Sequence, residues 1–270
     1  MVKETTFIKY SATGNDFIVV DNRQLQYGHW DLKIRKQLCQ RHFGVGADGI
    51  LFLENPITLK ADYLMRYFNS DGGECSMCGN GARALGLFAK KELGIKSKND
   101  GYYLFETQND LYQIAVMDGN DISLKMTELK EINAIDLADL FPAQKKFYMN
   151  TGVPHSVFMV DKVDCIEVSE VAPRLAHNHR FSEGCNINFF EKMSDHKIKI
   201  RTFERGVEGE TLSCGTGIVA TAYFCHLEWG WTGDILVQSR GGDLVVKIKS
   251  KDEIYFCGKV EKIFKGQLNF

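Results

Sequence analysis

The sequence lacks the features that would place it in a membrane, on a nucleic acid or in an export route. No run of about 18 apolar residues occurs, so no membrane-spanning helix is predicted. The net charge is −2 and no basic block is present, which argues against nucleic-acid binding. Residues 1–4 do not form the apolar core of a signal peptide. We therefore expect a cytoplasmic protein that contacts neither membrane nor nucleic acid.

The sequence signatures of phosphate and metal sites are also missing. Gly44, Gly46 and Gly49 have the spacing of a dinucleotide-binding loop, but they precede a predicted strand instead of opening a helix. Cys75 and Cys78 form a Cys-x-x-Cys pair, yet no second pair of ligands lies at short spacing to complete a zinc site. We therefore expect no metal and no cofactor.

The composition is that of a globular protein with room for two domains. The chain has 270 residues, of which 44% are hydrophobic and 25% are charged. Without a secretory signal, its eight cysteines are expected to be reduced thiols, most of them small core residues.

One motif occurs twice in the chain. Both copies read Arg-x-Phe, a polar loop containing glycine, and then Glu-x-x-x-Cys-Gly-x-Gly; the cysteines are Cys78 and Cys214, 136 positions apart. Each cysteine is followed by an apolar run, residues 82–93 and 218–229, that ends in Glu-x-Gly. A repeat this long, with one motif per copy, indicates two homologous halves and not a solenoid.

The two apolar runs predict buried helices, because they are apolar nearly all round and stop at a glycine. Two further helices are expected at 31–42 and 169–177. Short strands joined by tight turns are expected at 7–10, 17–21, 50–53, 61–68, 102–107, 111–117, 122–126, 147–150, 156–161, 197–203, 235–239, 244–248, 254–257 and 260–264.

Short successive strands favour antiparallel pairing over a doubly wound parallel sheet. We therefore predict an α+β fold of two pseudo-symmetric domains, each a mostly antiparallel sheet or barrel wrapped around a central hydrophobic helix. Residues 1–125 would form the first domain and residues 126–259 the second. A last strand within residues 260–270 is expected to return to the first domain.

The Cys-Gly-x-Gly turns predict activated thiols beside anion sites. Glycines leave the N–H groups of a helix start open to a carboxylate, and the positive potential there lowers a thiol pKa. Inverting a carbon that bears hydrogen needs one group to remove the proton and another to return one on the opposite face. Cys78 and Cys214 supply such a pair, while the helix starts stabilise charge on the carboxylate. The sequence predicts a cofactor-independent two-base epimerase or racemase.

On these and other motifs the chain resembles the diaminopimelate epimerase family. The resemblance covers nearly the whole chain and is carried by residues 13–17, 68–72, 78–83, 154–155, 204–206 and 210–217. It implies interconversion of LL- and meso-diaminopimelate, in lysine and peptidoglycan precursor biosynthesis, by a thiolate and a thiol, Cys78 and Cys214. The substrate-binding residues that it implies are Asn15, Asn69, Gly79, Asn80, Asn186, Glu204, Arg205, Gly215 and Thr216.

The resemblance also implies that His155 and Glu204 tune the thiols and that the protein is a cytoplasmic homodimer. Arg205 would grip the distal carboxylate of an amino diacid in a bidentate manner. Two positions depart from the family pattern: Gly49 stands where many members carry Gln, and Val153 stands where many carry Asn. A related racemase acting on histidine or hydroxyproline therefore remains an alternative.

A third hypothesis is a non-catalytic ligand-binding module or a Cys-x-x-Cys redox protein. Structural roles also stay open for single residues. Cys75 is expected to be a packing residue, and Glu74 and Glu210 are expected to bond the backbone of the motif loop. Asn15 and Asn69 are equally typical of turns.

Overall fold

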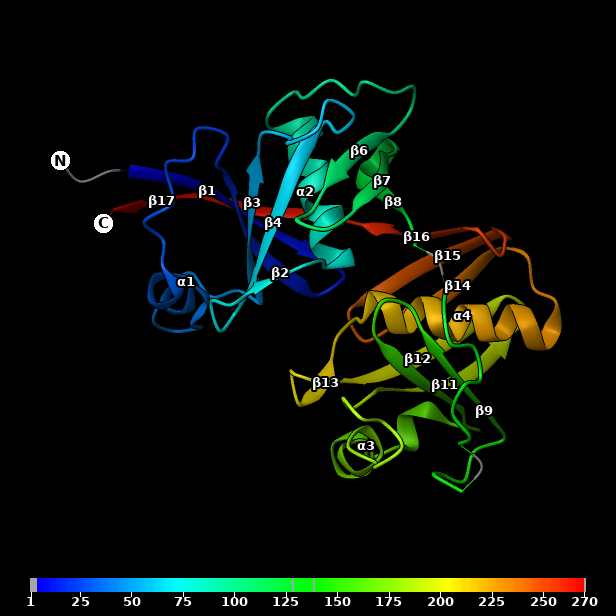
Figure 1. The fold of residues 1–270 in the computed structure, drawn as a ribbon. Coiled ribbons are helices and arrows are strands. Elements are labelled where there is room, and N and C mark those ends of the chain that lie inside the picture. Colours follow the sequence, from blue (N-terminus) through cyan, green and yellow to red (C-terminus); the bar gives the residue numbers. More distant parts are fainter. Residues whose placement is uncertain (1–3, 128, 138, 270) are drawn as a thin grey trace. The chain divides into compact units, whose positions relative to one another are not determined.

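The computed structural model, which describes residues 4–127, 129–137 and 139–269, divides into two compact units (Figure 1). Unit 1 comprises Met1–Lys125 and Gly258–Phe270, and unit 2 comprises Met126–Cys257. Residues 1–3 at the N-terminal end of the predicted first domain, and residue 270 of the predicted returning strand, lie outside the described residues.

Unit 1 is a curved, mostly antiparallel sheet around one helix. Its strands are β1 (Glu4–Ala12), β2 (Asn15–Asp21), β3 (Gly49–Glu54), β4 (Tyr63–Asn69), β5 (Glu74–Cys75), β6 (Tyr103–Glu106), β7 (Leu111–Val116), β8 (Asp121–Lys125) and β17 (Glu261–Asn269). They pair in the order β17–β1–β2–β3–β4–β6–β7–β8, with β5 as a short hairpin on β4. Only the β2–β3 and β4–β6 pairs of this series are parallel.

Unit 2 repeats this arrangement of pairs. Its strands are β9 (Lys145–Asn150), β10 (Pro154–Met159), β11 (Asn186–Ser194), β12 (Lys197–Glu204), β13 (Gly209–Thr211), β14 (Gly233–Ser239), β15 (Gly242–Ser250) and β16 (Glu253–Lys259). They pair in the order β9–β10–β11–β12–β14–β15–β16, and β13 is the hairpin on β12. The parallel pairs, β10–β11 and β12–β14, fall at the same places in the series as in unit 1.

Each unit packs its sheet on a buried helix, as the apolar runs predict. Helix α2 (Gly79–Lys91) contacts six strands of unit 1, and α4 (Gly215–Trp229) contacts strands of unit 2 (Figure 1). Helix α4 stops at Gly230, which has φ 68° in the left-handed region that glycine adopts at low cost. The predicted α+β class, with a central hydrophobic helix in each half, is confirmed.

Smaller elements differ slightly from expectation. Asp31 caps α1 (Leu32–Cys39) by accepting from the Ile34 N–H at 2.9 Å, but the helix ends at Cys39 and not near residue 42. Helix α3 (Val168–Ala176) and the single 3₁₀ turns at Asp118–Asn120 and Val163–Cys165 complete the elements of the described chain.

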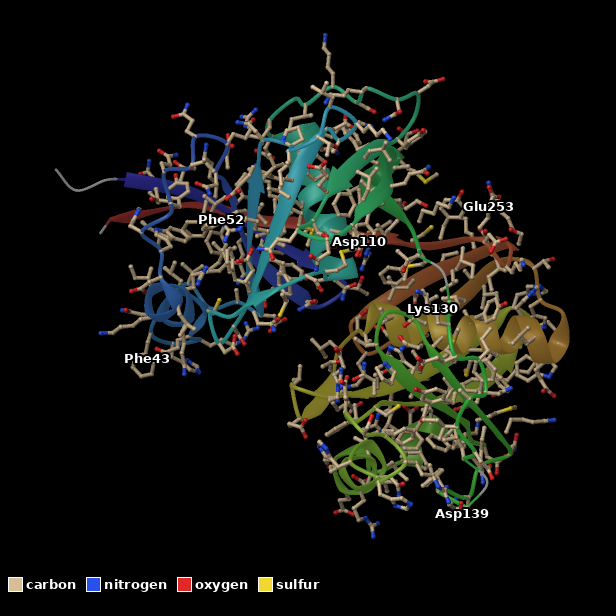
Figure 2. The ribbon with its side chains drawn as sticks, viewed as in Figure 1. Phe43, Phe52, Asp110, Lys130, Asp139 and Glu253 are labelled. Carbon is tan, nitrogen blue, oxygen red and sulfur yellow. The ribbon has the colours of Figure 1, made fainter. Side chains whose placement is uncertain are left out.

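Large aromatic side chains fill the two cores. Phe52 lies inside unit 1 with 2% of its surface exposed, whereas Phe43 lies at the periphery with 82% exposed (Figure 2). Among the described residues, no helix has the length and apolar character needed to cross a membrane.

Candidate active site

Cys78 is the N-cap residue of α2. Its backbone is extended, with φ −142° and ψ 117°, and its sulfur accepts the Gly81 N–H at 3.4 Å. The thiol also lies 3.9 Å from Asn15 Oδ1, at the start of β2. The sulfur therefore sits where the backbone N–H groups of a helix start favour negative charge.

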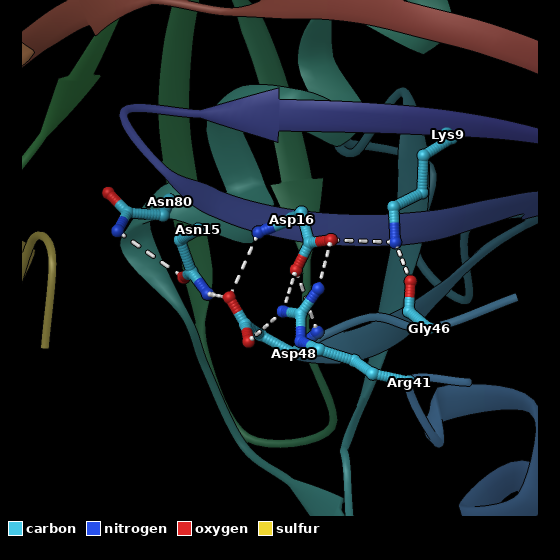
Figure 3. Close-up of polar contacts among 7 residues, drawn as sticks. All are labelled: Lys9, Asn15, Asp16, Arg41, Gly46, Asp48 and Asn80. Carbon is cyan, nitrogen blue, oxygen red and sulfur yellow. Dashed lines mark hydrogen bonds and ion pairs between the residues drawn. The ribbon is translucent and has the colours of Figure 1, made fainter. Parts of the chain in front are cut away.

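A chain of polar contacts fixes the Asn15 side chain (Figure 3). Its Nδ2 donates to Asp48 Oδ2 at 2.7 Å, and its Oδ1 accepts from Asn80 Nδ2 at 3.3 Å. Because an ionised carboxylate only accepts, Asp48 turns the amide so that Oδ1 lies on the side of Asn80 and Cys78. Arg41 holds Asp48 in turn, at 2.8 Å.

Asp16 connects this chain to the interior of unit 1. It forms ion pairs with Lys9 at 2.8 Å and Arg41 at 2.7 Å, and Lys9 also donates to the carbonyl of Gly46 (Figure 3). Burial alone raises the pKa of Asp16, but hydrogen bonds from Arg41 and Lys9 outweigh it and lower the pKa to about 2. No sequence pattern singled out Asp48 or Arg41. Asp48 nevertheless lies in the Gly44–Gly49 loop, whose glycine spacing is that of a dinucleotide-binding loop.

Asn69 and Asn80 have clear partners. Asn69, at the end of β4, donates from Nδ2 to the Cys75 sulfur at 2.8 Å. Asn80 Oδ1 accepts from Arg83 at 2.8 Å, and Arg83 also binds Thr13 Oγ1 at 3.0 Å. The side chain of Asn80 is thus held from two sides, with Gly79 and Asn80 forming the first turn of α2.

The space beside Gly49 is occupied by Tyr67. A Cβ atom at Gly49 would lie 2.6 Å from Tyr67 Cε2 and 2.6 Å from the carbonyl oxygen of Phe68. A side chain at position 49 is therefore incompatible with this packing.

Cys214 is the N-cap residue of α4 and is buried. Its sulfur lies 3.6 Å from Thr216 Oγ1. Burial raises the pKa of the Cys214 thiol well above its ordinary value, and the nearby Glu204 charge raises it further, while Thr216 and the Gly217 N–H act in the opposite direction. The prediction of a lowered thiol pKa is therefore wrong for Cys214, because desolvation outweighs the potential of the helix start.

Glu204 ends strand β12 (Lys197–Glu204), and Arg205 is the first residue of the following turn. Glu204 accepts the Thr211 hydroxyl, and the Arg205 backbone N–H donates to Asn186 Oδ1 at 2.8 Å. The Arg205 guanidinium binds the backbone carbonyl of Glu183. Asn186 therefore positions Arg205 through its backbone.

His155 lies on β10 and has no exposed surface. Burial, followed by the positive charge of Arg205, lowers its pKa to about 3. Its Nδ1 lies 3.1 Å from Asn188 Nδ2. The ring is therefore neutral at physiological pH and is held by a neighbour that sequence analysis did not single out.

The motif glutamates bind arginine side chains and not the loop backbone, which corrects the expectation for both. Glu74 forms a two-point pair with Arg66, at 2.8 Å for each contact. Glu210 forms the same pair with Arg201, at 2.7 and 2.8 Å. The Arg-x-Phe and Glu parts of the repeated motif therefore clamp each hairpin that delivers a cysteine to its helix.

Each unit thus assembles one half of the predicted residue set. Cys78, Asn15 and Asn80 come together in unit 1; Cys214, Glu204 and Thr216 come together in unit 2. Within the part of the chain that the structure describes, no group of three or more His, Cys, Asp or Glu side chains has the arrangement of a metal site.

Comparisons with known proteins agree with this arrangement. The sequence model described as diaminopimelate epimerase matches residues 7–131 and 147–263, which include both cysteine motifs. The chain belongs to the diaminopimelate epimerase family. It is 38% identical over 250 residues to the diaminopimelate epimerase of Flavobacterium psychrophilum, covering 92% of each chain. It is 36% identical over 277 residues to that of Methanocella arvoryzae, covering 97% of this chain and 96% of the relative.

Among solved structures, the fold is shared more widely than the family. A Bacillus anthracis phenazine biosynthesis protein of the PhzF family superposes with a TM-score of 0.71 at 17% identity, covering 98% of this chain and 99% of the other. Identity this low supports the common architecture and not a common activity. The diaminopimelate epimerase assignment therefore depends on the sequence relatives and on the duplicated cysteine motif.

Proposed function

We propose that this protein epimerises LL-2,6-diaminopimelate to meso-2,6-diaminopimelate without a cofactor. The observation that carries the proposal is the duplicated cysteine, placed in each unit at the N-cap of a buried helix, in a member of the diaminopimelate epimerase family. Lysine and peptidoglycan precursor biosynthesis are the routes that use this reaction.

In the proposed reaction, a thiolate removes the α-proton and a thiol returns a proton on the opposite face. Because burial raises the pKa of the Cys214 thiol, we assign Cys214 as the acid and Cys78 as the base of the first step. The Cα–H bond breaks, its proton goes to Cys78, and the electron pair spreads into the adjacent carboxylate. The Cys214 S–H proton then forms the new Cα–H bond, which leaves Cys214 as thiolate and Cys78 as thiol.

Backbone N–H groups at the two helix starts would bind the reacting carboxylate. These belong to Gly79 and Asn80 in one unit and to Gly215 and Thr216 in the other. Preorganised donors of this kind stabilise charge that develops during proton removal.

The remaining polar residues would hold the rest of the substrate. Asn15, Asn69, Asn186 and Glu204 would bind its polar groups, and Arg205 would bind the distal carboxylate. In this structure the Arg205 guanidinium binds the Glu183 carbonyl and lies 3.9 Å from the Glu183 carboxylate, which is 82% exposed, so a bidentate grip on the substrate carboxylate would replace a long, exposed ion pair by a shorter charge-assisted one. This residue would select a diacid over a simple amino acid.

The proposal includes a homodimer in the cytoplasm. None of the eight cysteines, all of which lie in the described residues, forms a disulfide, which agrees with a reducing compartment. Sedimentation of the purified protein would test the dimer. Cell fractionation would test the compartment.

Incubation with LL-diaminopimelate in deuterated water under reducing conditions tests the activity. Deuterium should enter one α-carbon, and Cys78→Ala and Cys214→Ala should each abolish the conversion. No exchange by the wild-type enzyme at micromolar concentration would overturn the proposal. If histidine or hydroxyproline were racemised faster than diaminopimelate in a panel of amino acids, that amino acid would be the substrate. Unchanged activity in Cys214→Ala would favour a Cys75–Cys78 redox protein.

A further inference from the structure

A small polar cluster lies buried beside α4 in unit 2. It consists of His155 and Ser156 on β10, Asn188 on β11 and Thr202 on β12, which are neighbouring strands. His155, Ser156 and Asn188 have no exposed surface, and Thr202 is 3% exposed. Buried polar groups need partners, so each hydrogen bond in this cluster constrains the next.

The orientation of the Asn188 amide is set by the backbone. One of its polar atoms lies 3.1 Å from the carbonyl oxygen of Ser156, and a carbonyl only accepts, so that atom is the nitrogen Nδ2. The other atom, Oδ1, accepts the Thr202 hydroxyl at 3.0 Å. The direction of the amide is therefore fixed before His155 is considered.

This orientation determines the protonation of the His155 ring. Asn188 Nδ2 lies 3.1 Å from His155 Nδ1 and has a second hydrogen to donate. A ring nitrogen that accepts an N–H carries a lone pair and no proton. A neutral imidazole has one proton, which must then be on Nε2.

We propose that Asn188 is a positioning residue that holds His155 as the neutral Nε2–H tautomer, so that the ring serves the reaction as a hydrogen-bond donor and not as a base. The catalytic part of this inference rests on the proposed function, whereas the tautomer does not. His155 Nε2 is buried and has no hydrogen-bond partner among the described residues. A buried donor of this kind is available to a group that arrives with the substrate or to a negative charge that develops beside it.

The cluster packs directly on the first turn of α4. A Cβ atom at Gly217 would lie 2.2 Å from Asn188 Oδ1 and 3.3 Å from His155 Cε1. The N–H of the same Gly217 acts to lower the pKa of the Cys214 thiol. His155 therefore lies beside the backbone that supports Cys214 and the proposed carboxylate site.

The tautomer has a consequence for proton movement. A neutral Nε2–H donor stabilises an anion beside it, but it offers no lone pair at Nε2 to receive a proton. The proton that Cys214 gives up must therefore pass to the substrate carbon or to solvent, and not to His155. In this enzyme the histidine stabilises charge, and the two sulfurs alone exchange the proton.

The first experiment reads the tautomer directly. Protein labelled with ¹⁵N-histidine is examined by long-range ¹H–¹⁵N correlation spectra, with His155 identified by the signal lost in His155→Gln. The expected pattern is a bare Nδ1 and a protonated Nε2, unchanged between about pH 5 and pH 8, where ordinary histidines titrate. A protonated Nδ1, or titration in that range, would overturn the inference.

The second experiment replaces the hydrogen-bond donor beside His155 Nδ1 by an acceptor. In Asn188→Asp, a carboxylate faces Nδ1 and can only accept, so the proton should move to Nδ1 or the ring should become an imidazolium. Epimerisation should then fall about 10²-fold or more, since a wrong tautomer costs up to ~10⁴-fold in a Ser–His–Asp triad, and its pH profile should gain a histidine titration. A changed tautomer with unchanged turnover would refute the catalytic role.

Thr202→Val is the matched control, because it removes the other partner of the Asn188 amide and leaves the Ser156 carbonyl in place. Its tautomer should be that of the wild type. If Asn188→Asp does not fold, the wild-type spectrum still decides the tautomer. If the wild-type enzyme epimerises normally but its His155 carries the proton on Nδ1, the tautomer inference is wrong and the proposed function stands. If His155 carries the proton on Nε2 but no epimerisation occurs, the proposed function is wrong and the tautomer stands.

Discussion

Replacing Gly217 by alanine is the sharpest test of how closely α4 is packed against Asn188 and His155. The new Cβ would lie 2.2 Å from Asn188 Oδ1, whereas ordinary contacts begin at 3.4 Å, so one of the two groups must move by about 1 Å. The Asn188 side chain cannot move easily, because three hydrogen bonds hold its amide.

The loss in free energy of unfolding follows from two opposing effects. Overpacking a tight interior costs about 1–3 kcal/mol, and loosening the amide adds about 1 kcal/mol for each weakened hydrogen bond. Alanine in place of glycine inside a helix returns about 1 kcal/mol. We therefore expect Gly217→Ala to lower the free energy of unfolding by about 1–3 kcal/mol. Epimerisation should fall about 10²-fold, since a 1 Å displacement of positioned groups has that effect.

Gly86→Ala, in the interior of α2, is the matched control. Its Cβ would lie 3.0 Å from Ile114 Cδ1, which is the end of a flexible side chain and can give way. We expect its unfolding free energy to stay within about 1 kcal/mol of the wild type, with unchanged turnover. Urea unfolding and deuterium exchange into the substrate measure both quantities. If Gly217→Ala matched Gly86→Ala in both, the packing argument would be refuted.

Three further predictions concern charged residues. Asp16, with its pKa lowered to about 2 by an arginine and a lysine against the opposing effect of burial, contributes on the order of 1 kcal/mol, after solvent screening, at pH values above its unfolded pKa of ~4, and loses this contribution as the pH falls through about 2. Asp16→Asn should therefore flatten the acid limb of stability against pH, and an unchanged limb would contradict the assignment. Asp48→Asn should raise KM about tenfold, because an amide no longer dictates the orientation of Asn15; steady-state kinetics showing an unaltered KM would count against it. Glu210→Gln should cost about 2–3 kcal/mol in urea unfolding and its repeat counterpart Glu74→Gln about 1 kcal/mol or less, since Glu210 is 12% exposed and also pairs with Arg240 at 2.9 Å, whereas Glu74 is 27% exposed; equal costs would show that neither burial nor the second arginine distinguishes the two glutamates.

Local patterns predicted the helices and most of the strands. The apolar runs after Cys78 and Cys214 became α2 and α4, and Asp31 caps α1 as expected. These features depend on residues close together in the sequence, where periodicity and capping chemistry are sufficient. The domain boundaries and the roles of the site residues stay predictions.

Contacts between strands that are distant in the sequence could not be predicted from the sequence pattern. Nothing in the chain around Asn188 signals that its amide meets His155, because the two residues meet only when β10 and β11 pair. The raised pKa of Cys214 could not be predicted from the sequence for a related reason. The helix start is visible in the sequence, but the burial that outweighs it depends on the whole unit.

The pairing of β1 with β17 has a consequence for the growing chain. The strand at Glu4–Ala12 is synthesised about 250 residues before its partner at Glu261–Asn269. During synthesis one edge of β1 therefore stays uncovered, and such an edge invites association with other chains. Residues 126–257 are synthesised in that interval, so the second unit is made before the sheet of the first unit can be completed.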